Sequence, residues 1–329
     1  MHVVVTGAGG FVGRALMQRL LDDPHALPSP SSLISPISRL TGIDQHFAPN
    51  THHWRVDKRV SLLEGDFADP ALLAQALLPA PDYVFHLASV PGSLAERDQA
   101  LGHRVNLMAC INLLQALAKP DAASSAPAPR VVFASSVAVY GSLPASGMVD
   151  ESQPAQPTLA YGAHKLMAEV LLADLSRQGR LDGISVRLPG IVARPPAVTG
   201  HGSAFMSDLI RRGLAGLDYD CPVSPQAQSW WMSLPCCINN LLHAARLPGQ
   251  SLALGRTVQL PVITATAGAL VAAIESETGQ PFSVRYVPDE RIEKLFGRLP
   301  QLRTPLARGL GFTDDGSLGQ LIRQATSLD

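Results

Sequence analysis

Two residues that could do acid–base chemistry, Tyr161 and Lys165, stand four positions apart in a stretch that predicts a helix. Side chains at this spacing share one face of a helix, so the phenol and the ammonium can converge on one site. A free tyrosine, with a pKa of about 10, is a poor base at neutral pH, and a nearby lysine cation favours its phenolate form. Taken alone, this spacing more often belongs to a solvated helix than to an active site.

A hydroxyl that could assist this pair comes earlier in the chain. Residues 131–134 predict a buried strand, and Ser135 and Ser136 follow it directly. A side chain at the carboxyl end of a buried parallel strand faces the ligand crevice of an open α/β sheet. Ser136 is the serine that we expect to orient a substrate oxygen, although a turn or cap hydrogen bond is the ordinary alternative. The predicted catalytic residues are Ser136, Tyr161 and Lys165.

A glycine-rich turn begins at Gly7, directly after a predicted strand over residues 2–6, and opens a helix that continues to about Leu21. Glycines at this spacing permit a tight turn, close approach of the main chain to a pyrophosphate and close packing of helix on strand. The amino end of the helix then binds phosphates through its free N–H groups and its dipole. This pattern predicts a dinucleotide cofactor bound by Gly7, Gly10, Phe11, Val12 and Gly13.

The choice of dinucleotide depends on the end of the second strand, which we predict over Ile37–Ile43. Asp44 then stands at its carboxyl end, where an acidic side chain would bind the adenosine ribose hydroxyls. A carboxylate at that position repels the additional phosphate of NADP, which favours NAD. If the strand were assigned differently, Arg39 would make NADP a candidate cofactor again. Asp44 could also be a simple turn residue.

The elements that must position these residues alternate along the chain. Short apolar runs over residues 2–6, 60–64, 83–86 and 131–134 alternate with helical segments such as 102–117. This alternation predicts an α/β fold with a Rossmann-type doubly wound parallel sheet. After about Leu188 the pattern loosens around helices near 204–214 and 234–245. We therefore expect an NAD-binding domain with the catalytic residues over 1–188. Residues 189–329 are expected to form mainly a smaller substrate-binding lobe, interleaved with the first domain and covering the carboxyl edge of its sheet.

Composition narrows the range of partners. The chain has 329 residues, of which 46% are hydrophobic and 16% charged, with a formal net charge of -1. Without an excess of Lys and Arg, a general affinity for nucleic acid or anionic membranes is not expected. The start of the chain lacks the pattern of a signal peptide, and no apolar run reaches the roughly 18 residues that span a bilayer. We expect a cytoplasmic protein with reduced cysteines, no metal and a small-molecule substrate.

At this point the chain resembles a known family, the extended short-chain dehydrogenases/reductases, also called the NAD-dependent epimerase/dehydratase family. The resemblance covers most of the chain and rests on motifs in a fixed order. They are Gly7-x-x-Gly10-x-x-Gly13, Gly65-Asp66-Phe67, His86-Leu87-Ala88, Val105-Asn106, Ser135-Ser136 with Tyr140-Gly141, Tyr161 with Lys165, and Arg187-Leu188-Pro189-Gly190.

The resemblance assigns roles to further residues. It implies that Asp66 and Phe67 flank the adenine, and that Asn106 supports the active-site lysine. It also implies that the middle of the cofactor and the nicotinamide contact the residues Leu87, Ala88, Ser89 and Pro189. Tyr161 and Lys165 are expected to contact the cofactor as well, since the lysine can also hold the nicotinamide ribose. Ser93 and Ser203 match positions that line the substrate pocket in the family. By the same likeness, the helical stretches 102–117 and 161–175 would form the four-helix interface of a homodimer.

Two segments bear on the substrate. Family members that act on nucleotide sugars usually carry a Phe-Asn step after the strand containing Arg187 and an Arg-Asp-aromatic run before a later helix. This chain has Leu188-Pro189-Gly190 and 229–235 in their places, which removes polar anchors for a diphosphate and favours a small substrate. Arg194 and Arg211 are candidate anchors for a carboxylate, although an arginine in such a position is more often a surface or packing residue.

The second half also resembles dehydrogenases that oxidise the C2 hydroxyl of D-erythronate, a four-carbon sugar acid, to the 2-keto acid with NAD. The likeness runs through Arg187-Leu188-Pro189, Val192-Ala193-Arg194-Pro195, Ser203-Ala204-Phe205, Leu214-Ala215-Gly216, Cys221-Pro222-Val223, Trp231-Met232-Ser233-Leu234-Pro235 and Val258-Gln259-Leu260-Pro261. The resemblance implies an NAD-dependent oxidoreductase in carbohydrate metabolism. An epimerase or dehydratase that acts on sugars or nucleotide sugars and keeps its NAD, and a non-catalytic NAD-sensing protein, are the alternatives.

Overall fold

The computed structural model describes residues 1–29, 35–121, 128–144, 147–196 and 202–326. Its contacts group the chain into two compact units. The first contains 1–136, 159–187 and 241–258, and the second contains 137–158, 188–240 and 259–329. A single division at residue 188 would therefore assign 137–158 and 241–258 to the opposite unit.

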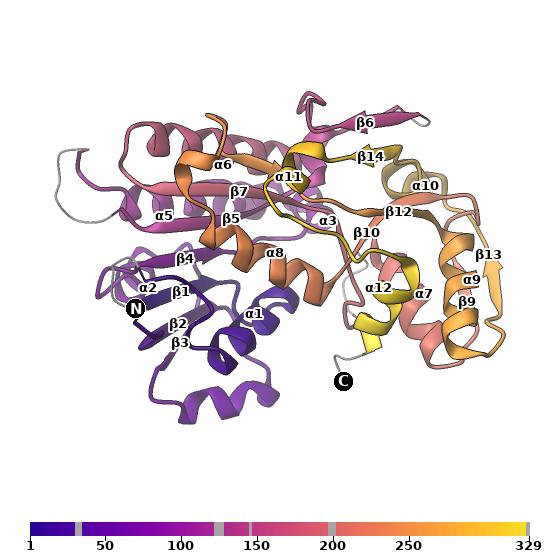
Figure 1. Ribbon diagram of the computed structural model, residues 1–329, viewed down its shortest axis with the longest axis horizontal. Helices are drawn as coiled ribbons and strands as arrows, with labels where there is room; N and C mark the ends of the chain where they lie inside the picture. The colour runs from indigo at the N-terminus through magenta and orange to yellow at the C-terminus, as the bar shows by residue number, and fades with distance from the viewer. Residues whose placement is uncertain (30–34, 122–127, 145–146, 197–201, 327–329) are drawn as a thin grey trace. The chain divides into compact units, whose positions relative to one another are not determined.

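The first unit is built on a seven-stranded sheet in the order β11-β7-β5-β4-β1-β2-β3 (Figure 1). From β5 to β3 each strand runs parallel to its neighbour. β1, β4 and the inner part of β5 are buried along their length, which explains their apolar sequences. The strands are β1 His2–Thr6, β2 Arg39–Asp44, β3 Val60–Glu64, β4 Tyr83–His86, β5 Arg130–Ser136, β7 Asp182–Leu188 and β11 Thr257–Gln259. The predicted Rossmann-type sheet is confirmed.

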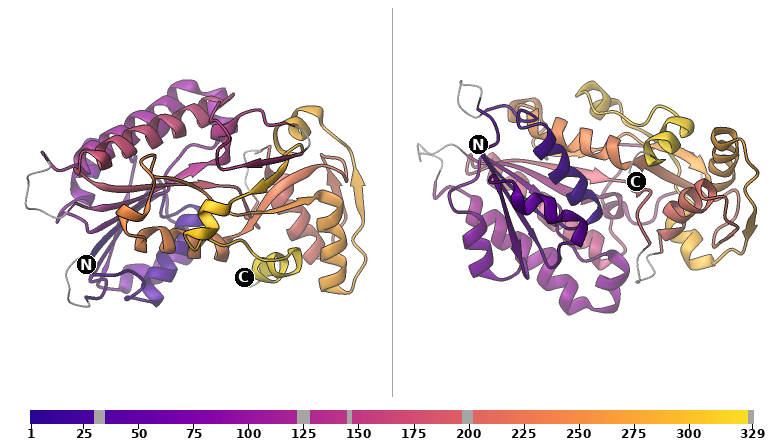
Figure 2. Two further views of the ribbon diagram at one scale, coloured as in Figure 1. Left: turned by 45° about the horizontal axis from the view of Figure 1, so that its top comes forward. Right: turned by 90° about the horizontal axis from the view of Figure 1, so that it is seen from below.

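Helices cover both faces of this sheet (Figure 2). On one face the apolar sides of α2, α5 and α6 form a core against Val4, Val84, Val131 and Phe133. On the other, α1 buries Leu16, Met17 and Leu20. The helices of this unit are α1 Phe11–Asp22, α2 Pro70–Ala76, α3 Gly92–Arg97, α4 Gln99–Gly102, α5 Ala109–Leu117 and α6 Ala160–Arg177, with short 3-10 helices at Pro49–Val56 and Gly249–Ser251.

The second strand and the helix predicted over 102–117 differ from their predicted form, and β5 extends beyond the predicted Ala134 to include Ser135 and Ser136. The second strand begins at Arg39 rather than Ile37 and includes Asp44 as its last residue. The single helix predicted over 102–117 is interrupted, because residues His103–Met108 form a π-helical turn between α4 and α5. Such wide turns often occur at functional sites, and periodicity over so short a segment does not reveal them.

The second unit has small sheets packed with helices. Its core gathers Phe205, Leu209, Trp231, Leu270 and Leu321. Trp230 and Trp231 are buried, and their indole N–H groups donate to the carbonyls of Pro300 and Ala265 at 2.7 and 3.0 Å. They therefore pack this unit. The strands are β6 Met148–Asp150, β8 Gly190–Val192, β9 Tyr219–Cys221, β10 Gln228–Ser233, β12 Ile263–Thr266, β13 Val284–Tyr286 and β14 Gln301–Arg303. The helices are α7 Ala204–Leu214, α9 Ala267–Thr278, α10 Glu290–Phe296, α11 Pro305–Gly309 and α12 Leu318–Thr326, with a 3-10 turn at Val137–Tyr140; α8 Leu234–Arg246 begins in this unit and ends in the first.

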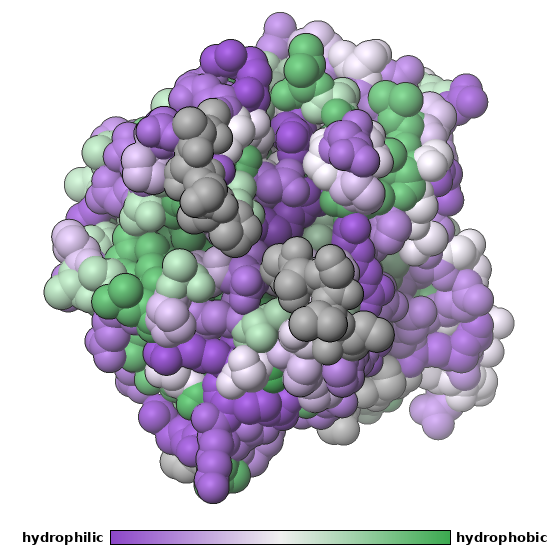
Figure 3. Space-filling view, turned by 60° about the vertical axis from the view of Figure 1, so that its left-hand side comes forward, coloured by the Kyte–Doolittle hydropathy of each residue, from purple (hydrophilic) through white to green (hydrophobic). Residues whose placement is uncertain are grey.

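The face of the molecule drawn in Figure 3 is mainly hydrophilic, with hydrophobic residues in smaller patches. Among the described residues, no helix is long and apolar enough to cross a membrane. The cysteines Cys110, Cys221, Cys236 and Cys237 are free and buried.

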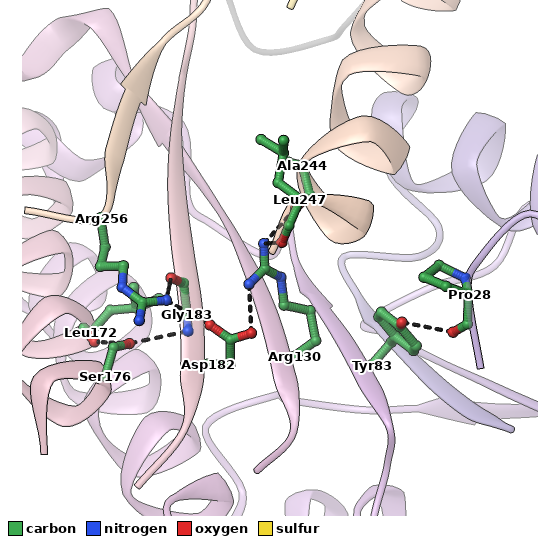
Figure 4. Close-up of polar contacts among 10 residues, drawn as sticks. All are labelled: Pro28, Tyr83, Arg130, Leu172, Ser176, Asp182, Gly183, Ala244, Leu247 and Arg256. Carbon is green, nitrogen blue, oxygen red and sulfur yellow. Dashed lines mark hydrogen bonds and ion pairs between the residues drawn. The ribbon is translucent and has the colours of Figure 1, made fainter. Parts of the chain in front are cut away.

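At the amino end of the sheet, Arg130 joins β5 to its surroundings (Figure 4). Its guanidinium donates to Asp182 at the start of β7 at 2.7 Å and to the carbonyls of Ala244 and Leu247 at 2.7 and 2.6 Å. Arg256 donates to the other oxygen of Asp182 at 2.5 Å. This ionic cluster fastens the sheet at the edge opposite the carboxyl ends of the strands.

Candidate active site

The glycine turn after β1 is closely packed on three sides. Gly7 has φ 73°, and a Cβ atom there would lie 2.7 Å from the backbone nitrogen of Ala88. A Cβ on Gly13 would lie 1.9 Å from the carbonyl oxygen of Gly7. The turn is fixed to the next strand by the N–H groups of Gly7 and Ala8, which donate to the carbonyl of Ile43 at 2.8 and 3.1 Å. Only glycine fits at either position.

The turn leads into the amino end of α1. Gly10 precedes the helix in an extended conformation, and its carbonyl accepts the first helical hydrogen bond, from Arg14 N–H at 2.9 Å. The N–H groups of Phe11, Val12 and Gly13 point out of the helix end without partners within the helix, as in any α-helix. N–H groups at a helix end that carries a partial positive charge suit a phosphate group, so the turn fits a dinucleotide.

Asp44 lies at the end of β2, against this turn. Its two carboxylate oxygens accept hydrogen bonds from the backbone N–H groups of Gly9 at 2.8 Å and Gln45 at 2.7 Å. A Cβ on Gly9 would lie 2.3 Å from the carbonyl of His46, so this glycine also allows the close approach. The carboxylate is thereby held at the edge of the glycine turn.

The segment after β3 holds the residues expected near the adenine. Asp66 accepts a hydrogen bond from Ala68 N–H at 2.9 Å and pairs with Arg104 of the π-helical turn. Partial burial acts to raise the pKa of Asp66, but these two donors lower it overall. Phe67 is only 6% exposed, and its ring centroid lies 5.1 Å from that of His86.

His86 ends β4 inside the core. Its Nδ1 lies 2.7 Å from the Thr6 hydroxyl, and its ring stacks on Phe133. Complete burial, together with the nearby charge of Lys165, lowers the pKa of His86 to about 3. The imidazole is therefore neutral and serves as a fixed hydrogen-bonding group just before Leu87, Ala88 and Ser89, the residues expected at the middle of the cofactor.

Tyr161 and Lys165 lie in the first turns of α6, on the face toward β5. Lys165 is 3% exposed; its Nζ donates to the carbonyl of Ala134 at 2.7 Å and lies 5.6 Å from the centroid of the Tyr161 ring. Ser136 is two residues beyond Ala134, half-buried at the end of β5. The lysine thus ties the tyrosine helix to the strand end that carries the serine.

The segment after β4 packs on the same helix. Gly92 lies against Tyr161, where a Cβ would be 3.5 Å from that of the tyrosine, and Ser93 follows in the first turn of α3. The amide of Asn106 accepts from Val90 N–H at 2.6 Å and donates to Val90 carbonyl at 3.0 Å. Asn106 therefore fixes the backbone of this segment.

Two charged residues that were not predicted from the sequence, Glu96 and Glu169, also make bonds that hold α6. Glu96 of α3 accepts a hydrogen bond from Ala160 N–H at 2.5 Å, at the first residue of the helix. Further along, Glu169 pairs with Arg187 at the end of β7 at 2.8 Å. Glu169 stands four residues after Lys165, and this spacing, continued from Tyr161, is the signal by which it could have been found.

The remaining predicted residues belong to the second unit. Pro189 lies between β7 and β8, and Ser203 directly precedes α7. Arg211 is paired with Asp208 one turn before it on α7, so its charge is already compensated. Among the described residues, no group of three or more His, Cys, Asp or Glu side chains could hold a metal ion.

Comparison with known proteins gives the family. Residues 3–230 match the NAD dependent epimerase/dehydratase family. The chain belongs to this family. It is 36% identical to the D-erythronate dehydrogenase of Cupriavidus necator over 98% of this chain and 97% of that protein. It is 31% identical to the D-erythronate dehydrogenase of Haemophilus influenzae over the whole of both chains. The crystal structure described as the nucleoside-diphosphate-sugar epimerase from Agrobacterium tumefaciens matches with a TM-score of 0.86 and 30% identity, covering 100% of this chain and 94% of that one. The protein is accordingly an enzyme of this nicotinamide-dependent family.

Proposed function

We propose that this family member is an NAD-dependent dehydrogenase that oxidises the C2 hydroxyl of a small, D-erythronate-like sugar acid to the 2-keto acid. The observation that carries the reaction type is the bond from Lys165 to the Ala134 carbonyl, which brings the tyrosine helix to the strand end carrying Ser136. The full-length likeness to two D-erythronate dehydrogenases supports the substrate class.

In the proposed reaction the chain's own groups handle the proton. Ser136 orients the C2 hydroxyl of the acid, and Tyr161, as the phenolate, removes its proton. The C2–H bond breaks and the hydrogen leaves with the electron pair of that bond, as hydride. The electron pair of the former O–H bond then forms the carbonyl at C2. When bound, the oxidised nicotinamide supplies the acceptor for that hydride. Lys165 is the buried cation that favours the phenolate. Positioned proton transfer of this kind contributes roughly 10²- to 10⁴-fold in rate.

The cofactor residues follow from the same proposal. The glycine turn of Gly7, Gly10 and Gly13 would hold the pyrophosphate, and Asp44 would accept hydrogen bonds from the adenosine ribose. A carboxylate already held by backbone N–H groups cannot turn away from a 2′-phosphate, which favours NAD over NADP. We assign the adenine to Asp66 and Phe67, the middle of the cofactor to 87–89, the nicotinamide to Pro189, and the substrate to Ser93 and Ser203.

The test is the Tyr161→Phe variant, assayed against a panel of four-carbon and related aldonic acids with NAD. NADH absorbance should appear with wild type for at least one acid, and turnover should fall by at least about 10²-fold in the variant. NADH affinity, measured by fluorescence titration, should stay within a factor of about two, because the hydroxyl is not needed for cofactor binding. Near-normal turnover in Tyr161→Phe would exclude the mechanism.

A sugar epimerase is the second candidate, favoured by the likeness to the structure described as a nucleoside-diphosphate-sugar epimerase. Such an enzyme would transfer hydride from the sugar to bound NAD and back to the sugar, so no NADH would be released. Turnover of a nucleotide sugar together with no response to any acid would establish this alternative. A non-catalytic NAD sensor would bind NADH but turn over neither class of substrate.

We also propose that the enzyme is a cytoplasmic homodimer of carbohydrate metabolism. Met108, Met167 and Val170 are 41%, 49% and 63% exposed on the π-helical turn and α6. Apolar side chains exposed on neighbouring helices are typical of a subunit interface. Light scattering on the purified protein should give twice the mass of the chain.

A further inference from the structure

Behind the catalytic pair, α6 carries a buried carboxylate that the proposed reaction does not use. Glu169 is 3% exposed and stands one helical turn after Lys165, which itself stands one turn after Tyr161. Residues at this spacing follow one face of the helix, here the face toward the sheet. A carboxylate so fully removed from water is costly unless it is paired and hydrogen-bonded.

The carboxylate of Glu169 is satisfied from two strands. Arg187, at the end of β7, donates from Nε to Oε1 at 3.0 Å and from Nη2 to Oε2 at 2.8 Å. The Ser135 hydroxyl, at the end of β5, donates to Oε1 at 2.5 Å. Two parallel bonds from one guanidinium fix orientation as well as distance. The third turn of α6 is therefore fastened to the carboxyl ends of two neighbouring strands.

These contacts also separate the roles of the two adjacent serines. Neighbouring residues of a strand direct their side chains to opposite faces. Ser135 is 2% exposed and bonds to the helix, whereas the half-buried Ser136, on the opposite face, is the serine that we assign to the substrate. The Ala134 carbonyl just before them accepts from Lys165. Three consecutive residues of β5 thus have separate roles: Ala134 bonds to the lysine, Ser135 bonds to the glutamate, and Ser136 is assigned to the substrate.

We propose that Glu169 and Arg187, linked to β5 through Ser135, are positioning residues that set the rotation and depth of α6, and so place the Tyr161 hydroxyl for proton transfer. This role rests on the proposed function of Tyr161. The glutamate acts through the helix and does not touch the substrate or the cofactor. Because a displacement of about 1 Å in a reacting group can lower the rate about 10²-fold, small movements of the helix should be costly.

The experiment compares Glu169→Gln with two matched controls on the holoenzyme. Asp174→Asn removes a carboxylate from an exposed pair with Arg177 on the same helix. Arg130→Met breaks a buried ion pair of the same sheet (Figure 4), at the end of β5 opposite to Ser136. The first controls for loss of a charge on α6, and the second for loss of stability without loss of positioning.

In Glu169→Gln, kcat should fall by about 10²-fold while KM for the acid and NADH affinity change by less than about threefold. The rising limb of the pH profile of kcat should shift, because the movement of α6 changes the surroundings of the phenol. Ser135→Ala, which leaves the ion pair intact, should lower kcat by about tenfold. Both controls should keep kcat within about threefold of wild type at a temperature where they are folded. If Glu169→Gln does not fold, Ser135→Ala decides the question.

A kcat near wild type in Glu169→Gln or, failing that, in Ser135→Ala would overturn the inference, as would an equal loss in Arg130→Met. A second readout needs no substrate. The phenolate absorbance of the holoenzyme is titrated with pH, and the same titration of a matching Tyr161→Phe variant is subtracted. A midpoint unchanged by Glu169→Gln would overturn the inference even if no acid in the panel were oxidised. If the wild-type enzyme oxidised no acid in the panel, that result by itself would overturn only the proposed substrate.

Discussion

Replacing Gly13 with alanine should separate α1 from the glycine turn. The added Cβ would lie 1.9 Å from the carbonyl oxygen of Gly7, 2.8 Å from its carbonyl carbon and 2.9 Å from the Cα of Ala8. All three are backbone atoms, and the turn is itself bonded to Ile43. Since non-bonded heavy atoms are most stable about 3.5 Å apart, the helix would have to move away by more than about 1 Å.

The expected size of the effect follows from this displacement. Forcing one additional carbon into a closely packed site typically costs about 1 to 3 kcal/mol, and contact with rigid backbone places this site near 3 kcal/mol. For a chain of this size, with about 2.1 cal/mol/K of unfolding entropy per residue, the loss corresponds to a fall in Tm of about 4 °C. The amino end of α1 would also withdraw from the phosphates, so NADH affinity should fall by about 10²-fold. Thermal unfolding by circular dichroism and NADH fluorescence titration measure the two effects.

Gly255→Ala is the matched control in the same unit. A Cβ there meets no atom within 4 Å. Its free energy of unfolding should stay within about 0.5 kcal/mol of wild type, and NADH affinity should not change. A Gly13→Ala variant with the Tm and NADH affinity of wild type would refute the packing argument. A variant with a lowered Tm but unchanged NADH affinity would refute the assignment of this helix end to the cofactor.

Three further outcomes are expected. Asp44→Ser should raise the kcat/KM ratio for NADP over NAD by at least about tenfold, since a charge repulsion of roughly 1 to 4 kcal/mol is removed; an unchanged ratio would exclude Asp44 from cofactor selection. The pKa of His86 falls from 6.5 to about 3 on folding, so the unfolded chain binds the additional proton, and stability present above pH 6.5 is lost as the pH falls toward 3. His86→Gln should therefore flatten the dependence of the free energy of unfolding on pH over this window, by up to about 1.4 kcal/mol per pH unit, and an unchanged slope would contradict the neutral imidazole. Asn106→Ala leaves the buried N–H and C=O of Val90 without partners and should lower the free energy of unfolding by about 1 to 3 kcal/mol, as measured in urea; no change would show that water replaces the amide.

Much of the first unit could be predicted because its signals are local. Three strands, over residues 2–6, 60–64 and 83–86, have the predicted bounds. In the second unit, α7 also covers 204–214 as expected. The π-helical turn at His103–Met108 could not be predicted, since it changes which residues face inward without changing the apolar composition. The 3-10 helix over Pro49–Val56 and the short strands of the second unit also gave no usable periodicity.

By itself the sequence determined the family, the sheet and the order of the reactive residues. A glycine turn, a serine at a strand end and a Tyr/Lys pair depend on spacing within single elements, and spacing is visible in one dimension. Tertiary structure alone decided which groups hold those residues in place. Glu169, Ser135 and Arg187 come from a helix and two strands, and their shared hydrogen bonds join residues 34 and 18 positions apart. These bonds between residues distant in sequence form only when the sheet is assembled. The free-energy cost of burying the Glu169 carboxylate is offset only where the Ser135 hydroxyl and the Arg187 guanidinium both donate to it.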